Sequence, residues 1–207
     1  YKRQVYLTPL QLGQLAESCT VNADIVWVLG TVGLRWGELA GLRVRDVNVV
    51  KNRLRIEQNA VVVGTEVVVG TPKTHERREV VVPASVMKLI ESRMVGKGAD
   101  DLLWSRKGGL PLRPPTHGGW YYNALERCMG AHEGFPRVTP HGLRHVAAGL
   151  MVSAGANVLA VSRQLGHADP SMTLKTYAAL FDEDLSALGA RVDECVQNVV
   201  KLQSRGA

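Results

Sequence analysis

The chain has 207 residues, enough for one sizeable hydrophobic core. With 45% hydrophobic and 21% charged residues, it has the composition of an ordinary globular protein and not of a disordered one. No apolar run approaches the roughly 20 residues that a membrane helix needs, and the net charge of +6 favours an anionic partner, with nucleic acid first.

Local signals divide the chain into a helical beginning, a valine-rich middle and a helical end. Thr8, Pro9 and Gln11 predict a capped helix through Ala16, because they supply a capping box and a proline at the first helical position. Further helices are expected at 23–32, 35–42, 83–94, 115–130, 140–154, 157–165 and 171–180. Residues 96–118 are rich in glycine, proline and basic side chains and are expected to form a loop.

The valine-rich segments 54–56, 67–69 and 80–82 predict one small sheet. We expect three antiparallel strands within about 53–82. The expected fold is therefore mainly α with a small three-stranded antiparallel sheet, an α+β class.

Arg35 and Glu38 stand three apart in Gly-Leu-Arg-Trp-Gly-Glu-Leu, so on a helix they share one face. One interpretation is a solvated surface ion pair, worth less than about 1 kcal/mol. The other is that Glu38 holds Arg35 rigid, so that its guanidinium clamps a phosphate. The segment alone favours the surface ion pair.

Lys73 lies in Gly-Thr-Pro-Lys-Thr, between the second and third expected strands. It is either a solvated turn lysine or a lysine at a hairpin tip that meets a DNA backbone as a point charge and proton donor.

His141 shares a helical face with both Arg144 and His145. The free N–H groups at the start of that helix also favour an anion. Two histidines four apart could instead bind zinc, but the zincin pattern places a glutamate directly after the first histidine, and Gly142 stands there. The pattern therefore favours a phosphate over a metal ion.

His167 and Tyr177 each allow two interpretations. Gly166 is suited to end a helix, so His167 either complements the helix dipole or turns inward to a site. Tyr177 taken alone is typical of a core residue, and beside cationic groups its phenol becomes a possible nucleophile.

Taken together, these segments resemble the catalytic domain of the tyrosine recombinase (phage integrase) family, over almost the whole chain. The strongest part contains His-Gly-Leu-Arg-His at 141–145, Gln-Leu-Gly-His at 164–167 and Met-Thr-Leu-Lys-Thr-Tyr at 172–177. Segments 33–39 and 71–74 add the family's two other sites. The resemblance implies six catalytic positions: Arg35, Lys73, His141, Arg144, His167 and Tyr177.

The implied activity is that of a site-specific DNA recombinase, which cleaves and rejoins DNA through a 3′-phosphotyrosine intermediate. Arg35 and Arg144 would bind the phosphate, and Tyr177 would attack it. His141 is expected to be the base or a base relay, and His145 to be structural. No metal, nucleotide or other cofactor is expected.

Other basic residues near the first arginine are expected to grip DNA phosphates, although some must simply be solvated. They are Arg43, Arg45, Lys51, Arg53 and Arg55.

Residues 1–183 are expected to form the catalytic domain and 184–207 an amphipathic C-terminal helix. That helix packs on its own domain or, as the resemblance suggests, docks on a neighbouring protomer. The chain begins at Tyr1 and lacks the family's N-terminal DNA-clamping domain, so we expect a fragment of a longer protein.

The resemblance implies double-stranded DNA with attachment-type sites as the partner, bound by a homotetramer and in some settings by an accessory DNA-bending protein. Without DNA, a monomer or weak association is expected. Three widely separated cysteines indicate reduced thiols in a cytosolic protein. The resemblance implies the cytoplasm of a bacterial host cell, in association with the nucleoid. Two rivals remain: a type IB topoisomerase-like enzyme, and a catalytically silent DNA-binding protein.

Overall fold

The computed structural model of the protein describes residues 5–70, 77–178, 180, 193 and 197. Its named α-helices are α1 (Pro9–Glu17), α2 (Ala23–Val32), α3 (Trp36–Gly41), α4 (Ala84–Met94), α5 (Trp120–Ala131), α6 (Gly142–Ser153) and α7 (Val158–Leu165). Residues 170–178 are also helical. Short 3₁₀ helices cover Val44–Asp46 and Lys107–Gly109.

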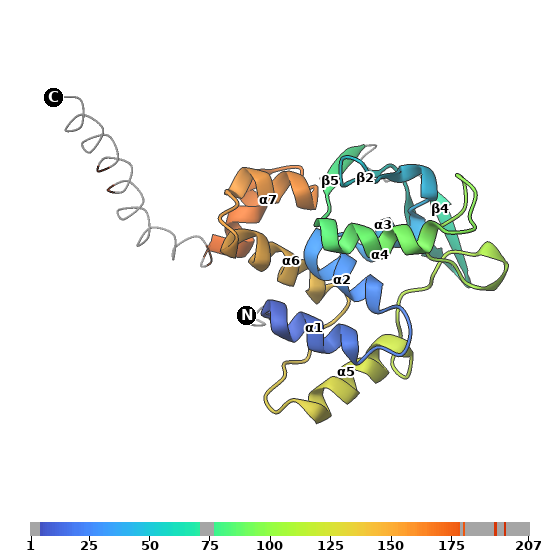
Figure 1. Ribbon diagram of the computed structural model, residues 1–207, viewed down its shortest axis with the longest axis horizontal. Coiled ribbons are helices and arrows are strands. Elements are labelled where there is room, and N and C mark those ends of the chain that lie inside the picture. The colour runs from blue at the N-terminus through green and yellow to red at the C-terminus, as the bar shows by residue number, and fades with distance from the viewer. Residues whose placement is uncertain (1–4, 71–76, 179, 181–192, 194–196, 198–207) are drawn as a thin grey trace.

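Helix α2 lies in the middle of the molecule and packs against α1, α4 and α6. Figure 1 shows α1 and α5 together at one end and the strands at the other, with α6 and α7 beside α2. Most of the apolar core surrounds α2, whose Ile25, Val26 and Val28 are fully buried. Within the described part of the chain, no helix has the length and apolar character needed to cross a membrane.

The beginning of α1 confirms the expected capping box. The Thr8 hydroxyl accepts from the Gln11 backbone N–H at 3.2 Å, and the Gln11 side chain accepts from the Thr8 N–H at 2.9 Å. Helix α2 ends at Gly33, whose φ of 78° is open to glycine at little cost. A β-carbon there would lie 2.7 Å from the Leu165 side chain, so this glycine also allows α7 to approach closely.

The three-stranded antiparallel sheet is present, but its strands differ from those expected. It consists of β1 (Val47–Asn48), β2 (Arg53–Ile56) and β5 (Arg78–Val81), in the order β1-β2-β5. The expected strand at 67–69 instead lies in β4 (Glu66–Gly70), which pairs with β3 (Asn59–Val63) as a separate hairpin. Valine-rich composition identified strands correctly, because it reports β propensity, but it does not decide which strands pair.

A second, smaller apolar cluster joins α6, α7 and the helical residues 170–178. It contains Ala148, Val152, Val161, Leu165 and Tyr177. This cluster brings the C-terminal motifs of the sequence to the same side of the molecule as α6.

Candidate functional site

The first expected pair lies at the beginning of α3. The Glu38 side chain accepts a hydrogen bond from the Arg35 backbone N–H, and Arg35 Nη1 donates to the same carboxylate, both at 2.9 Å. The Glu38 side chain is 6% exposed, whereas that of Arg35 is 47% exposed. The pair is therefore not a solvated surface ion pair, because a buried carboxylate holds an arginine that stays half exposed.

Arg78, which the sequence did not single out, binds the same carboxylate. Its Nη1 and Nη2 donate to the two Glu38 oxygens at 2.9 and 2.8 Å. Burial acts to raise the pKa of Glu38, but the hydrogen bonds and charge of Arg78, helped by Arg35, outweigh it and lower the pKa. The signal that could have identified Arg78 is alternation along β5, which places it on the same side as buried Val80.

Arg144 is the second expected phosphate arginine, and it is buried on α6. Its Nη1 donates to the Gly33 carbonyl at 2.7 Å and its Nη2 to the Leu165 carbonyl at 2.6 Å. Burial and the charge of Arg35 lower the pKa of Arg144 to about 10, which still leaves it a cation at neutral pH. Arg144 therefore joins the ends of α2 and α7.

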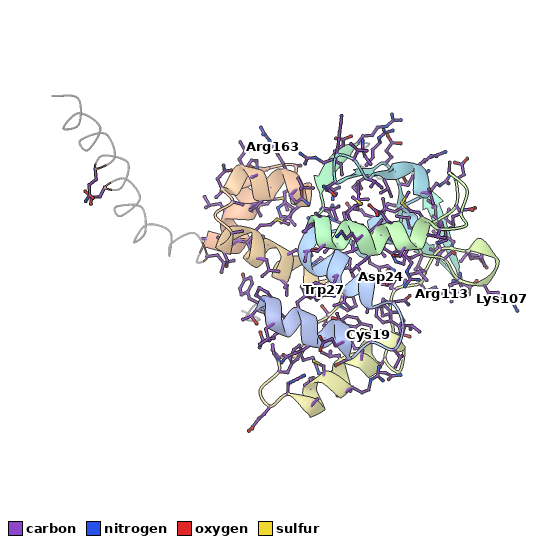
Figure 2. The ribbon with its side chains drawn as sticks, viewed as in Figure 1. Cys19, Asp24, Trp27, Lys107, Arg113 and Arg163 are labelled. Carbon is purple, nitrogen blue, oxygen red and sulfur yellow. The ribbon has the colours of Figure 1, made fainter. Side chains whose placement is uncertain are left out.

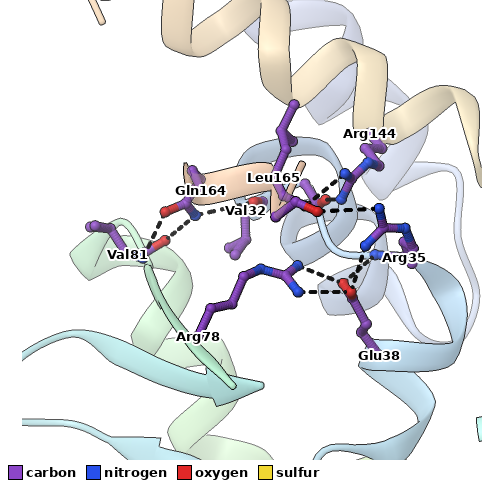
Figure 3. A network of polar contacts seen from close by, with 10 residues as sticks. Val32, Arg35, Glu38, Arg78, Val81, Arg144, Gln164 and Leu165 are labelled. Atoms are coloured by element: carbon purple, nitrogen blue, oxygen red, sulfur yellow. Dashed lines mark hydrogen bonds and ion pairs between the residues drawn. The ribbon is translucent and has the colours of Figure 1, made fainter. Parts of the chain in front are cut away.

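The two expected arginines converge on the end of α7. Figure 3 shows Arg35 and Arg144 both pointing toward this backbone, while Arg78 approaches Glu38 from β5. Arg35 Nη2 donates to the Gly166 carbonyl at 3.4 Å. Three guanidinium groups near one carboxylate give the site a net positive charge, which suits a phosphate.

Gln164 fixes the position of this end of α7. Its side chain accepts from the Val81 N–H and donates to the Val81 carbonyl, both at 2.9 Å, and also donates to the Val32 carbonyl at 3.1 Å. Strand β5 and helices α2 and α7 thus meet at one polar side chain, as Figure 3 shows.

His167 follows Gly166, the residue that caps the end of α7, and lies close to the arginines. Its Nδ1 is 2.7 Å from the Thr173 hydroxyl oxygen, and the Thr173 side chain is fully buried. Burial, together with the charges of Arg144 and Arg35, lowers the pKa of His167 to about 4. The ring is therefore neutral at physiological pH, and its bond to Thr173 fixes its orientation.

Tyr177 is 2% exposed and packs in the smaller apolar cluster. Its hydroxyl oxygen lies 2.9 Å from Nδ1 of His145. Burial raises the pKa of Tyr177 to about 12, even though the charge of Arg144 acts to lower it. Tyr177 is thus both a core residue and a member of the site.

The contact to Tyr177 bears on the roles expected for His141, which caps the beginning of α6, and for His145, which lies on the helix. His145, expected to be structural, is the histidine within hydrogen-bond distance of the phenol. The His141 ring stands edge-on to His145, with centroids 5.5 Å apart. Burial and the charges of Arg144 and Arg35 lower the pKa of His141.

The remaining expected residues are Lys73 and the five basic residues that were expected to bind DNA phosphates. Lys73 lies outside the described residues, in the segment between β4 and β5. Arg43 and Arg45 both pair with Asp100, at 3.4 Å for Arg43, so part of their charge is already neutralised.

The other three basic residues lie in or beside β2. Lys51 is exposed just before the strand, and Arg55 lies 3.9 Å from Glu57. Arg53 and Arg55 line a surface hollow of about 340 Å³. DNA contact by these residues stays a prediction.

Comparisons with known proteins agree on one family. The model of the phage integrase family matches residues 7–184. The integrase of Mycobacterium phage L5 is 32% identical over 178 residues, which cover 82% of this chain and 47% of that protein. The tyrosine recombinase XerC of Pelobacter propionicus is 29% identical over 155 residues, which cover 73% of this chain and 45% of that protein.

The fold also matches a solved structure of a transposon protein. The Tn1549 transposon integrase, in complex with transposon right end DNA, aligns with a TM-score of 0.75 and 23% identity. The alignment covers 91% of this chain and 67% of that one. This chain spans about half the length of the curated relatives it matches.

Proposed function

Since the chain belongs to the phage integrase family, we propose that it is a site-specific DNA recombinase that breaks and rejoins DNA through a 3′-phosphotyrosine intermediate. The observation that carries the proposal is the convergence of Arg35, Arg144 and His167 at the end of α7. An anion bound there would meet two guanidinium groups and one neutral imidazole, next to the helix that bears Tyr177.

Attack by Tyr177 requires a base that accepts the phenol proton. An ordinary tyrosine, with a pKa near 10, costs about 4 kcal/mol to ionise at pH 7, and burial raises the pKa of Tyr177 further. Among the described residues, His145 Nδ1 lies 2.9 Å from the phenol oxygen, and burial lowers the pKa of His145, which favours its neutral form. We therefore assign the first proton transfer to His145. His141, whose ring stands edge-on to His145, is then free to act at the phosphate.

The proposal includes the following bond changes, in which the role of Lys73 is the one that the family resemblance implies. The Tyr177 oxygen forms a bond to phosphorus, the bond from phosphorus to the 5′ oxygen breaks, and Lys73 gives the leaving oxygen its proton. Arg35, Arg144 and His167 stabilise the charge on the non-bridging oxygens. Because Tyr177 is 2% exposed, DNA binding has to uncover the phenol before it can attack the phosphate.

The proposal requires no metal ion, because the arginines supply the positive charge that Mg²⁺ gives in other phosphoryl transfers. It requires no nucleotide, because the phosphotyrosine bond retains the energy of the bond that breaks. The substrate is a nicked duplex that the protein selects from a pool of randomised sequences. The test measures how much of this duplex the protein captures covalently in excess EDTA. We expect full capture, and loss of capture that Mg²⁺ restores would overturn the proposal. Recombinant products would separate a recombinase from a topoisomerase-like enzyme.

Assembly belongs to the same proposal. We expect double-stranded DNA to bring four protomers together, with an accessory DNA-bending protein in some settings. The segment 184–207, expected to dock on a neighbouring protomer, lies outside the described residues except at 193 and 197.

Thr173→Val tests the orientation of His167. Valine keeps the shape of the buried threonine but removes the hydroxyl that meets His167 Nδ1. We expect single-turnover cleavage of the captured duplex to slow about tenfold to a hundredfold, because a small misplacement of a catalytic group is costly. Thr173→Ser, which keeps the hydroxyl, should cleave at nearly the wild-type rate. Equal rates for the valine variant and the wild type would show that Thr173 does not position His167.

A further inference from the structure

We propose that Arg78 is a positioning residue, which saturates the Glu38 carboxylate and thereby leaves Arg35 free to bind the phosphate. The inference rests on the proposed function, and it adds a third arginine to a site in which the sequence indicated two.

The hydrogen bonds of Glu38 are shared unequally between the two arginines. Arg78 donates from both Nη1 and Nη2, one to each carboxylate oxygen. Arg35 uses only Nη1 of its side chain, together with its backbone N–H. Each oxygen of Glu38 therefore accepts two hydrogen bonds, which leaves no place for Arg35 Nη2.

Exposure separates the roles of the two arginines. The Arg78 side chain is 16% exposed and the Arg35 side chain 47% exposed, although both bind the same buried carboxylate. Arg78 is thus the covered member of the group, and Arg35 is the member that faces an incoming ligand. Because Glu38 carries one negative charge and the two arginines carry two positive charges, one positive charge remains for that ligand.

Arg78 also supports the turn that leads to His167. Gly166 has a φ of 67°, and a β-carbon built on it would lie 2.6 Å from the Arg78 guanidinium carbon. The guanidinium group therefore packs directly on the Gly166 backbone, whose carbonyl accepts from Arg35 Nη2. Arg78 is in contact with both the carboxylate that holds Arg35 and the turn that carries His167.

Loss of Arg78 has a specific consequence. Glu38 would remain buried without its bidentate partner, and an unpaired buried carboxylate is strongly unfavourable. Arg35 is the other guanidinium bonded to Glu38 among the described residues, and its Nη2 makes only a long bond to Gly166 at 3.4 Å. Arg35 would therefore turn Nη2 onto the vacated oxygen and form its own bidentate pair, which removes it from the phosphate.

The experiment compares Arg78→Met, Arg78→Met/Glu38→Gln and the matched control Arg77→Met. Arg77 is the neighbouring arginine, 76% exposed and 3.9 Å from Glu57. Single-turnover cleavage of the nicked duplex captured by the wild type is measured at saturating protein. We expect Arg78→Met to slow cleavage about a hundredfold and Arg77→Met to leave the rate nearly unchanged.

The double variant is the decisive one. Glutamine at position 38 carries no charge to capture Arg35, so the double variant should cleave about tenfold faster than Arg78→Met alone. A purely structural role for Arg78 predicts that the second substitution slows the enzyme further. If Arg78→Met does not fold, Arg78→Lys replaces it, since one ammonium group cannot bind both oxygens of Glu38 in a fork.

A crystal structure of Arg78→Met provides a readout that does not depend on activity. We expect both Nη atoms of Arg35 on Glu38, and an unmoved Arg35 would overturn the inference. If the wild-type protein cleaves the duplex but the double variant is no faster than Arg78→Met, the inference about Arg78 is overturned, while the proposed function stands. If the wild type captures no duplex, the proposed function fails, and with it the phosphate-binding role that the inference gives Arg35.

Discussion

Tyr177→Phe is expected to abolish covalent attachment to DNA while non-covalent DNA binding stays nearly intact. The substitution removes only the phenolic oxygen, and the ring keeps its packing in the smaller apolar cluster. Loss of the hydrogen bond to His145 should cost about 1 kcal/mol of folding free energy, so the variant should still fold. A denaturing gel of protein with the nicked duplex measures the covalent complex, and a binding titration measures affinity.

Tyr121→Phe is the matched control for this experiment. Tyr121 is also fully buried, and its hydroxyl donates to the Val138 carbonyl at 3.1 Å, but it lies in the main core cluster away from the site. The control should capture DNA as the wild type does. A covalent complex that persists in Tyr177→Phe would mean that another residue is the nucleophile.

Arg144→Lys is expected to lower single-turnover cleavage by about 10²–10³-fold, although the positive charge is kept. The guanidinium fork reaches the Gly33 and Leu165 carbonyls together, at 2.7 and 2.6 Å, and one ammonium group cannot span both. A buried carbonyl left unpaired costs about 1–3 kcal/mol, so the free energy of unfolding should also fall by about this amount. Cleavage rates and urea denaturation measure the two effects.

Arg163→Lys controls for a general effect of replacing an arginine beside the site. Arg163 lies on α7 close to Leu165 in sequence, and Figure 2 shows it at the outer edge of the molecule. It should keep the wild-type rate and stability. If Arg144→Lys also cleaves at the wild-type rate, the fork geometry of Arg144 has no part in the chemistry.

The sequence predicted those parts of the fold that depend on neighbouring residues. The capping box of Thr8 and Gln11 and the end of α2 at Gly33 were correct, because caps and glycine conformations are local. The strand pairing was wrong, since residues 67–69 pair with β3 in the hairpin and not with β2. Pairing depends on contacts between segments, which valine content does not encode.

In the candidate site, too, contacts between residues close in sequence were predicted and contacts between distant residues were not. Arg35 and Glu38 are three residues apart, and their spacing alone predicted that they meet. Arg78 lies forty residues beyond Glu38, and the contact between His145 and Tyr177 joins residues 32 apart. Such contacts exist only after the tertiary fold forms, so motif spacing could predict neither the contact of Arg78 with Glu38 nor that of His145 with Tyr177.

Identifying the residue that carries DNA after cleavage tests directly whether Tyr177 is the nucleophile. The wild-type protein is trapped on the nicked duplex in EDTA, digested with nuclease and trypsin, and analysed by mass spectrometry. Tryptic cleavage after Lys175 and Arg191 gives peptide 176–191, in which Tyr177 is the one tyrosine. We expect a nucleotide joined through its 3′-phosphate to Tyr177 in this peptide. A nucleotide on any other residue, or cleavage with no protein-bound nucleotide, would contradict it.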